Sequence, residues 1–569
     1  MKALLCFVPV LVLLLLASGE SSGQAENLPV SHSAYAFLKR MELKGIISRY
    51  HDAILPISRK EVADFLNEIQ KHEGELSSAE RGFLHDFLRE FQYDRAGTLE
   101  GFHTLIDSES ETFGSALAGT FSDREKFLYA FADSNLSFFV NGLFSVDARR
   151  ISGDALGSDR AEFIQFGGRV RGTVFGKLGY YLLATNAHFW GSRDLLRRDR
   201  VIRQAYTLNV LNAKNFDFVE GYARFDGGIV SAQVGRERLL WGNGFSEKMI
   251  ASDNVRVYDF IRADAKYKAM KYTFVHAWLL GKRTSIQFVL PSDSSVLFNE
   301  PVVADKYFAA HRIEFSFPRL FDVGGQEMVI YSNRSPDLAY LNPITLIESA
   351  QRSREERDNV FWAFDIQAHF IPRIELHGTF LLDDLNFPDL FTDTWSDRHA
   401  IQAGAMYVDP FGIENMSLKV EYTKVKPYVF SHNRSRDNDY GSLGAPLGPR
   451  IGPNADAWFY NVDILPTRNL SFSLGVSLER QGENWYNAAG ELVNVGGDIL
   501  QPHRSFDPQR AVFLDGILIK TSRMTFLGTY EFINQMWLDV WYEYESSRNV
   551  TDATVGKNHN AALRVRVDF

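Results

Sequence analysis

Two-residue alternation of apolar and polar side chains constrains this chain more than any other feature. At the C-terminus, Leu563, Val565, Val567 and Phe569 alternate with Arg564, Arg566 and Asp568. Similar alternation recurs at 313–317, 364–370, 374–380, 416–422, 470–478 and 538–544. Successive side chains of a β-strand point to opposite faces. The pattern therefore predicts a large antiparallel β-structure with one apolar and one polar face.

Such strands need either a second sheet or a membrane to cover their apolar face. The chain is 45% hydrophobic and 14% aromatic, yet its mean hydropathy is only −0.18. A transmembrane β-barrel explains this combination, because its lipid-facing residues are interleaved with polar residues that face the lumen. No run of 18 apolar residues follows residue 25, so no transmembrane helix is expected.

The N-terminus predicts export. A basic start at Lys2 is followed by an apolar run from Ala3 to Ala17 and then by small residues. This order is typical of a secretory signal peptide, here assigned to residues 1–25. The only cysteine, Cys6, lies within it, which excludes a disulfide scaffold and a cysteine-based metal site.

The connections predict a barrel of about 18 strands over residues 101–569. Tight turns are expected at 176–177, 226–228, 281–283, 318–319, 371–373, 409–412, 465–467 and 534–535. Long loops are expected at about 189–215, 237–265, 292–309, 333–359, 426–456 and 481–510. The alternating last strand with its terminal Phe569 resembles the C-terminal signal of bacterial outer-membrane barrels. We therefore expect location in the outer membrane, contact with its lipids, and recognition of the last strand by the barrel assembly machinery.

Residues 26–100 predict a small periplasmic helical domain. Ser58 and Ser77 each precede a glutamate by three residues, as in a capping box, and each begins an apolar stripe with helical spacing. An earlier helix is expected at 33–44, ending at Gly45. The stretch from Ala34 to Phe65 loosely resembles an S-layer-homology module, which would attach to a wall polymer. The alternative is a plug or cap on the periplasmic end of the barrel.

Several functions are disfavoured. The net charge of −10 argues against nucleic-acid binding. The known hydrolase and nucleotide-binding motifs that we sought do not occur. Asp383-Asp384 and Asp397-x-His399 suggest a membrane protease at the barrel rim, but ordinary loop roles are favoured. For His311 and His369, hydrogen bonding in the lumen is favoured over metal binding. We expect no enzymatic activity, no cofactor and no metal.

Arginine is concentrated in two predicted loops. Arg193, Arg197, Arg198, Arg200 and Arg203 occupy one loop, and Arg352, Arg354 and Arg357 occupy another. Guanidinium groups bind carboxylates and phosphates in a bidentate manner. The loops therefore predict either a surface for an acidic glycan or lipopolysaccharide, or a solvated charge network with the many acidic residues. Loop tryptophans such as Trp395 and Trp485 would stack on sugars or join an interfacial belt.

Four blocks carry a resemblance to a known family. They are 235–244 (GRERLLWGNG), 307–314 (YFAAHRIE), 331–343 with its Tyr-Leu-Asn-Pro end, and 443–456. Together, over roughly residues 100–569, they resemble the capsule assembly Wzi family. The resemblance implies an 18-stranded barrel with a periplasmic helical part. It also implies a non-enzymatic lectin that binds capsular polysaccharide at the cell surface.

The candidate site or signature residues come from these blocks and from the first arginine-rich loop. They are Arg236, Glu237, Arg238, Trp241, Gly242, Gly244, His311, Arg312, Tyr340, Asn342, Arg197 and Arg198. The first three are expected either to form a charge network in the lumen or to contact glycan. The alternative function is a channel or porin for export or uptake of a polar or anionic solute.

Overall fold

The computed structural model describes residues 24–106, 119–154, 157–210, 213–290, 293–355, 357–384, 386–432 and 437–569. The predicted signal peptide lies outside these residues except for its last two positions. Among the described residues, no helix is long and apolar enough to cross a membrane.

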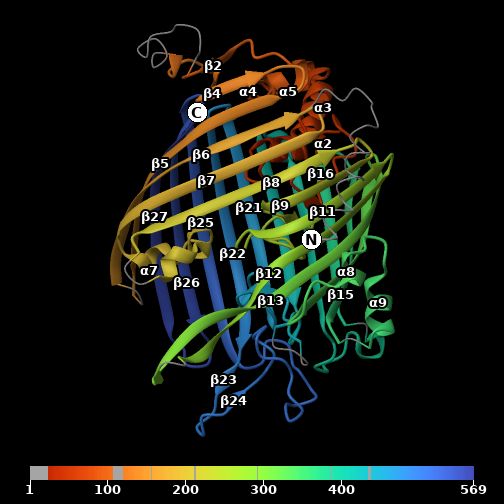
Figure 1. The fold of residues 1–569 in the computed structure, drawn as a ribbon, viewed down its shortest axis with the longest axis vertical. Coiled ribbons are helices and arrows are strands. Elements are labelled where there is room, and N and C mark those ends of the chain that lie inside the picture. The colour runs from red at the N-terminus through yellow and green to blue at the C-terminus, as the bar shows by residue number, and fades with distance from the viewer. Residues whose placement is uncertain are drawn as a thin grey trace.

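Eighteen antiparallel strands close into a barrel, which confirms the predicted fold (Figure 1). They are β5 (Ser137–Gly153), β6 (Gly157–Val174), β7 (Leu178–Gly191), β8 (Asn215–Asp226), β9 (Val230–Glu237), β11 (Tyr258–Tyr267), β12 (Met270–Leu290), β13 (Asp293–Phe317), β14 (Phe321–Ser332), β15 (Asn359–Ile371), β16 (Ile374–Asp383), β17 (His399–Val408), β18 (Met416–Val425), β21 (Ala455–Thr467), β22 (Leu470–Glu483), β25 (Ile517–Ile533), β26 (Met536–Asn549) and β27 (Val555–Asp568). The last strand pairs with β5, and the Phe569 amide donates to the Gly142 carbonyl at 2.9 Å. The short β4 (Tyr129–Ala132) extends the pairing of β5 beyond this point.

The predicted alternation is confirmed by exposure. On β15, Phe364 and Ile366 are 50% and 43% exposed, whereas Asp365 between them is 7% exposed. The same holds on β13, where Ile313 and Phe315 are exposed and Arg312 is buried. The apolar side chains therefore form an outer belt suited to lipid, and the polar side chains face the lumen.

One pair of strands is longer than predicted. A turn was expected at 281–283 and a loop at 292–309, but β12 and β13 instead form one extended hairpin. The register shifts between Leu280 and Arg283, so Gly281 and Lys282 lie at a β-bulge. A bulge absorbs an extra residue without reversing the chain. The prediction of a turn at 281–283 is therefore wrong, because glycine beside charged residues lies here at a bulge.

Residues 24–104 form a compact unit, here called the plug, at the end of the barrel that also holds the C-terminus (Figure 1). Its elements are α2 (Ala34–Leu43), β1 (Ile54–Leu55), α3 (Arg59–Gln70), η1 (Glu73–Glu75), α4 (Ser78–Glu90), α5 (Gln92–Ala96) and β2 (Phe102–Thr104), which pairs with β3 (Glu125–Phe127).

The predicted helix ends are confirmed with one difference. Gly45, just after α2, has a φ of +74°, as a left-handed helix terminus requires. The capping box at Ser77 is complete, with reciprocal bonds to Glu80. At Ser58 only half of the box forms, because the Glu61 carboxylate pairs with Lys266 of the barrel wall instead.

The plug is fastened to the wall mainly by charged and polar groups. Lys39 lies 2.8 Å from the Glu375 carboxylate of β16, and Arg262 of β11 donates to the Pro56 carbonyl at 3.0 Å. The strand β1 also pairs with β10 (Leu240–Trp241), which belongs to a loop inside the barrel. The plug interpretation is therefore the one that the contacts support.

The pair between Glu61 and Lys266 makes the plug sensitive to acid. Burial raises the pKa of the Glu61 carboxyl, but Lys266 and Lys271 outweigh burial and lower it from 4.5 to about 2. A carboxyl whose pKa is lower in the folded state than in the unfolded chain stabilises the fold at pH values above its unfolded-state pKa. This contribution is lost as the pH falls toward 2. We expect the free energy of unfolding of the wild type to exceed that of Glu61→Gln by roughly 2 kcal/mol at about pH 6. This difference should vanish by about pH 2.

The thermal unfolding of both proteins, followed from about pH 6 to pH 2, measures that margin. Other carboxylates titrate in both proteins, so their effects cancel in the difference. A margin that stayed constant over this range would contradict the assignment.

The loops at the opposite end carry the remaining elements. They are α7 (Arg193–Leu196), η2 (Ile202–Gln204), η3 (Tyr206–Asn209), β10, α8 (Leu338–Leu341), α9 (Ile347–Ser353), η4 (Phe387–Asp389), β19 (Gly441–Ser442), β20 (Ala445–Pro446), β23 (Trp485–Tyr486) and β24 (Leu492–Val493). A further turn, η5 (Pro410–Gly412), lies at the plug end between β17 and β18.

Candidate functional site

The arginine-rich loop 192–214 folds over the mouth of the barrel. Ser192 caps α7 by accepting from the Leu195 amide at 3.2 Å. Leu196 and Ile202 are buried against Phe163 and Phe216, whose strands present these rings to the lumen. The apolar residues thus hold the loop to the wall, and Arg198, Arg200 and Arg203 face the interior of the mouth.

Beneath this loop lies a cavity of about 640 Å³, here called the arginine cavity. Its walls come from loops 192–210, 238–257 and 437–454 and from the barrel strands β5, β18, β21, β22, β25, β26 and β27. Seven of the lining residues are arginines and five are acidic, although the whole chain has a net charge of −10. The arginines are Arg149, Arg150, Arg198, Arg200, Arg203, Arg450 and Arg523.

Part of this set is held in place by carboxylates. Arg149 lies 2.6 Å from Asp199, and Arg450 lies 2.7 Å from Glu479. Glu479 also binds Arg523 at 2.5 Å, so one carboxylate orients two guanidinium groups. Although burial lowers the pKa of Arg450, Glu479 and Glu247 outweigh it and raise the pKa above its usual value. These ion pairs fix the geometry of the cavity.

Two arginines of the loop remain available for a ligand. Within the described residues, neither Arg198 nor Arg203 forms an ion pair, and both side chains are exposed to the cavity. Burial lowers the pKa of Arg203, and the neighbouring Arg450 and Arg200 lower it further. Arg203 therefore lies among like charges, an arrangement that an anionic ligand would stabilise.

A second cavity of about 800 Å³ adjoins the first and shares Arg203 and Arg450 with it. Lys282 and Lys306 add further positive charge to its lining. Lys306 is held by Asp439 at 3.0 Å. The two cavities together make one continuous cationic region at the mouth of the barrel.

Aromatic residues complete the arginine cavity. Trp541 of β26 and Phe459 of β21 both line it from the wall. Rings of this kind offer an apolar face to a sugar, while arginine binds its carboxylates in a bidentate manner. The combination suits an acidic carbohydrate better than a small inorganic anion.

The block 235–244 leads into a loop that turns into the lumen, here called the inner loop (residues 238–254). Trp241 is fully buried and packs edge-to-face against Phe308, with 6.4 Å between the ring centroids. Its indole N–H donates to the Gln326 side chain. Asn243 donates to Asp365 at 3.0 Å. The loop therefore packs on the wall from within, between the plug and the arginine cavity.

Glycine is needed at two positions of the inner loop. Gly242 has a φ of +129°, which L-residues rarely adopt. Gly244 has no room for a side chain, because an added Cβ would lie 2.1 Å from the Glu247 carbonyl and 2.5 Å from Gln402. These glycines shape the chain reversal and contact no open cavity.

The charged residues of the same block do not act as one network. Glu237 faces the lumen and accepts from Asn27 of the plug at 2.9 Å and from Gln233 at 2.8 Å. Arg236 points to the opposite, outer face and pairs with Asp259 at 2.8 Å. The expectation of a shared lumenal network is therefore wrong for Arg236, and Arg238 is half-buried at the start of the inner loop.

Arg312 serves the plug rather than the mouth. It is buried, and its guanidinium lies 2.8 Å from Glu314 and 2.8 Å from Asp365. Glu314 in turn binds the ring of His51 in the plug. Arg312 therefore organises a buried polar centre where the plug, the wall and the inner loop meet.

Three predicted residues lie on the outside of the barrel. His311 pairs with Glu327 at 3.0 Å on the outer face of the wall, so the prediction that it bonds in the lumen is wrong. Tyr340 donates to Asp358 at 2.8 Å, and Asn342 closes a turn by accepting from the Ile344 amide at 3.2 Å. Both belong to a segment that covers His311 from outside. The structure thus does not bring these residues to the arginine cavity.

Of the twelve candidates, Arg198 alone is among the residues lining that cavity, and Arg197 on the same loop pairs with Asp194 at 2.9 Å instead. The candidate set missed Arg203, Arg450, Arg523 and Trp541. The cluster at 193–203 was a usable signal for Arg203. Arg450 and Arg523 stand alone in the sequence, and only closure of the barrel brings them together.

The suggested protease centre does not form. Asp397 and His399 do meet, at 2.7 Å, but the His399 ring packs against Phe391 and Phe380 on the outer face. Asp383 lies on the lumen side, where it accepts from the Phe430 amide at 2.6 Å. The wall separates the two halves of the expected centre.

Comparison with known proteins gives a family and a fold. The sequence profile of the capsule assembly protein Wzi family matches residues 139–562. No curated protein matches the chain.

Among solved structures, this chain is similar to Wzi of Escherichia coli, with a TM-score of 0.53 at 12% identity, over 95% of this chain and 99% of that chain. That protein is described as an outer-membrane protein involved in group 1 capsule assembly and as a carbohydrate-binding β-barrel. OpdQ of Pseudomonas aeruginosa has a TM-score of 0.41 at 8% identity, over 77% and 99% of the two chains. OpdK of the same organism, solved with vanillate, has a TM-score of 0.42 at 10% identity, over 76% and 99%.

Proposed function

This chain belongs to the capsule assembly protein Wzi family, and we propose that it is a non-enzymatic outer-membrane β-barrel that binds or anchors capsular polysaccharide at the cell surface. The observation that carries the proposal is the arginine cavity, a cationic and partly aromatic recess at one end of an overall acidic barrel. The E. coli protein with the same fold is described as carbohydrate-binding.

The orientation follows from barrel topology. With an even number of strands, both ends of the barrel sequence lie on one side, and short turns face the periplasm in bacterial barrels. The plug and Phe569 lie on that side, and the arginine cavity lies among the long loops on the other. We infer a periplasmic plug, a cell-surface cavity, and recognition of the terminal strand by the barrel assembly machinery.

The alternative of a channel has less support. A buried apolar cluster joins the inner loop and loop 426–454 to the lumenal face of β11–β17. Trp241, Phe430 and Tyr440 are each fully buried in it. Such packing obstructs the lumen between plug and cavity, so a steady open conductance in planar bilayers would contradict the lectin proposal.

The test is binding of a purified acidic capsular polysaccharide to the full-length protein in detergent. Removing Arg198 and Arg203 together deletes the two loop cations of the cavity that form no ion pair with a described residue. Charged hydrogen bonds contribute about 1.5 to 3 kcal/mol each, so we expect Arg198→Ala/Arg203→Ala to weaken binding at least tenfold. Affinity of the wild type is expected to fall with added salt.

Arg197→Ala is the matched control, because Arg197 lies on the same loop but does not line the cavity. It should bind as the wild type does. A neutral polymer bound equally well by all three proteins would assign recognition to other residues. Failure of the wild type to bind any surface polysaccharide would overturn the proposal.

A further inference from the structure

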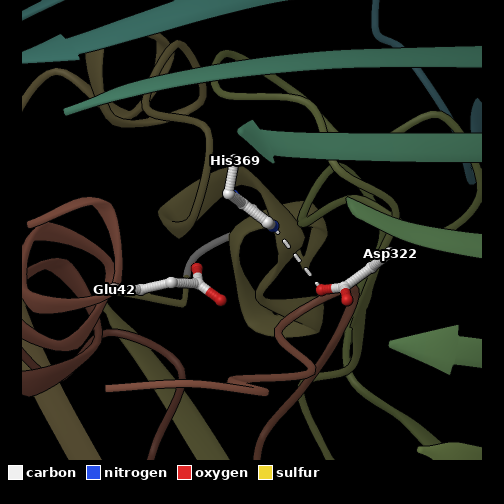
Figure 2. A group of neighbouring side chains, drawn as sticks. All are labelled: Glu42, Asp322 and His369. Atoms are coloured by element: carbon white, nitrogen blue, oxygen red, sulfur yellow. Dashed lines mark ion pairs between the residues drawn. The ribbon is translucent and has the colours of Figure 1, made fainter. Parts of the chain in front are cut away.

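Three ligand-type side chains meet where the plug touches the wall (Figure 2). Glu42 comes from α2, Asp322 from the start of β14 and His369 from the end of β15. One oxygen or nitrogen of each lies within 4.8 Å of the others. Figure 2 shows the His369 ring pointing toward Asp322, with the Glu42 carboxylate to one side.

His369 lacks a hydrogen-bond partner although it is buried. Its side chain is only 7% exposed, and neither ring nitrogen makes a hydrogen bond to a described residue. The nearest oxygen, from Asp322, is 3.6 Å from Nε2. The sequence favoured a hydrogen-bonding role for this histidine, but the structure leaves that role unfilled, and a buried unpaired polar group is costly.

The surroundings also hold more carboxylates than cations. Lys39 is shared by Glu42, Asp52 and Glu375, at 2.7 to 2.9 Å. Asp322 is buried, and within the described chain its ion pair is with His369.

Two other nearby cations have partners elsewhere. Lys44 binds Glu80 at 2.7 Å, and Arg319 donates to the Gly45 carbonyl at 3.2 Å. Arg49 also lines the adjoining cavity of about 430 Å³. An additional positive charge between Glu42 and Asp322 would therefore be stabilised.

We propose that Glu42, Asp322 and His369 bind a divalent metal ion of the zinc type, which fastens the plug to the barrel wall. Imidazole with two carboxylates is a donor set that Zn²⁺ uses, with bonds of about 2.0 to 2.2 Å. Tetrahedral ligands at that range stand about 3.3 Å apart, close to the present spacing of His369 and Asp322. Glu42 closes the set by a side-chain shift, while Lys39 keeps Asp52 and Glu375.

The experiment is a Zn²⁺ titration of full-length protein stripped with a chelator, in detergent at neutral pH. We expect one tight site per chain and a rise in Tm of several degrees with saturating Zn²⁺. His369→Gln should weaken binding at least 100-fold and abolish the Tm rise. Asp322→Asn, which keeps the shape of the side chain, should weaken binding at least tenfold.

His85→Gln is the control, because His85 is exposed on the plug and pairs only with Glu73 at 2.8 Å. It should titrate as the wild type does. Tight binding that survives both His369→Gln and Asp322→Asn would overturn the proposal, as would the absence of a stoichiometric site in the wild type. If His369→Gln does not fold, Asp322→Asn alone decides.

A different observation supports a second inference. Residues 333–355, here called the outer clamp, pack on the outside of the barrel instead of over its mouth. Figure 1 shows α8 and α9 beside the wall near β15. Tyr340 packs on Tyr331 at 5.0 Å, and Ile347 is buried in the same cluster with Tyr307 and Val329 of the outer face.

Polar groups fasten the clamp at its inner side. The Glu327 carboxylate accepts from the Ile347 amide at 2.8 Å and from the Glu348 amide at 2.5 Å. Tyr272 of β12 donates to the Pro343 carbonyl. Backbone groups that face lipid must be satisfied within the protein, and these bonds contribute to that.

Residues 338–346 of the clamp expose apolar side chains outward, whereas Arg352 and Arg354 further along the clamp are exposed and charged. Leu338, Ile344 and Leu346 are 81%, 85% and 62% exposed. The Pro343 carbonyl accepts a hydrogen bond from Tyr272, and Tyr272 lies opposite Ile313 of the outer belt on the neighbouring strand. The exposed apolar surface of the clamp is thus continuous with the lipid-facing surface of the barrel.

We infer that the 338–346 part of the outer clamp is embedded in the membrane and that its exposed side chains contact lipid acyl chains. This inference rests on the barrel spanning a membrane but not on the proposed ligand. Cys6 is the only cysteine, so a Cys6→Ser background allows one spin label at a chosen position. The positions are Ile344→Cys, Phe364→Cys in the outer belt and Ala489→Cys in the exposed loop between β23 and β24.

The labelled proteins are placed in phosphatidylcholine nanodiscs, and the label is exposed to oxygen or to a water-soluble nickel complex. Oxygen concentrates in acyl chains, whereas the complex stays in water. We expect Ile344→Cys to match Phe364→Cys, with a ratio of oxygen to nickel relaxation several-fold above that of Ala489→Cys. A ratio equal to that of Ala489→Cys would overturn the inference.

Discussion

Arg312→Met is expected to lower the free energy of unfolding by about 3 to 5 kcal/mol, the cost of removing one partner from a buried ion cluster. The guanidinium contacts both Glu314 and Asp365, whose side chains are 3% and 1% exposed. Without it, two carboxylates lie close together inside the barrel. Methionine keeps most of the volume, so the loss reports charge and hydrogen bonding more than packing.

Thermal unfolding with Arg236→Met as the control checks this expectation. Arg236 also pairs with one aspartate, but on the outer face, where both side chains are about half exposed, at 46% and 54%. Exposed pairs contribute about 0 to 1 kcal/mol, so the control should be nearly neutral. Adding Glu314→Gln and Asp365→Asn to Arg312→Met should recover stability. If both arginine substitutions lowered the free energy of unfolding equally, Arg312 would not be the organising cation of a buried ion cluster.

The contrast between Arg236 and Arg312 shows what the sequence could predict. Val230, Val234 and Arg236 are separated by even numbers of residues, so strand alternation alone assigns Arg236 to the apolar face. Arg312 alternates with Ile313, which assigns it to the lumen. The sequence alone therefore predicts on which face of the wall each of these side chains lies. Applied to Arg236, this rule excludes the lumenal network that was expected for it.

Other features were not accessible in this way. Arg40 of the plug donates to the Met416 carbonyl, a contact between residues 376 positions apart. Arg198 and Arg450 meet in one cavity only because the barrel closes. Local patterns encode strands, caps and turns, whereas contacts across a lumen depend on strand number and register. The fold was therefore predictable from one sequence, and the composition of the cavity was not.

The inner loop links the buried centre to the arginine cavity. Gln402 donates to the Glu247 carbonyl at 3.0 Å, and Glu421 accepts from the Ser246 amide at 3.2 Å. The Glu247 carboxylate then accepts from the Arg450 backbone and lies 3.3 Å from its guanidinium. Burial raises the pKa of Glu247, and Arg450 opposes that rise. The position of Arg450 thus depends on the inner loop, whose Ser246 and Glu247 also line the arginine cavity.

Gly244→Ala tests that dependence. The new methyl group would overlap the Glu247 carbonyl and the Gln402 side chain, at 2.1 and 2.5 Å, so the loop must shift. We expect a loss of about 1 to 3 kcal/mol in stability, typical of overpacking. Because the shift moves Glu247 and Arg450, polysaccharide affinity should also fall several-fold in the protein that remains folded.

Gly74→Ala is the matched control, because an added Cβ at Gly74 meets no atom within 4 Å. It should leave Tm and polysaccharide affinity unchanged. A Gly244→Ala protein with lower stability but wild-type affinity would separate the inner loop from the cavity and leave it a purely structural element. A parallel loss of both would explain why the block 235–244 recognises no ligand itself and still controls binding at the cell surface.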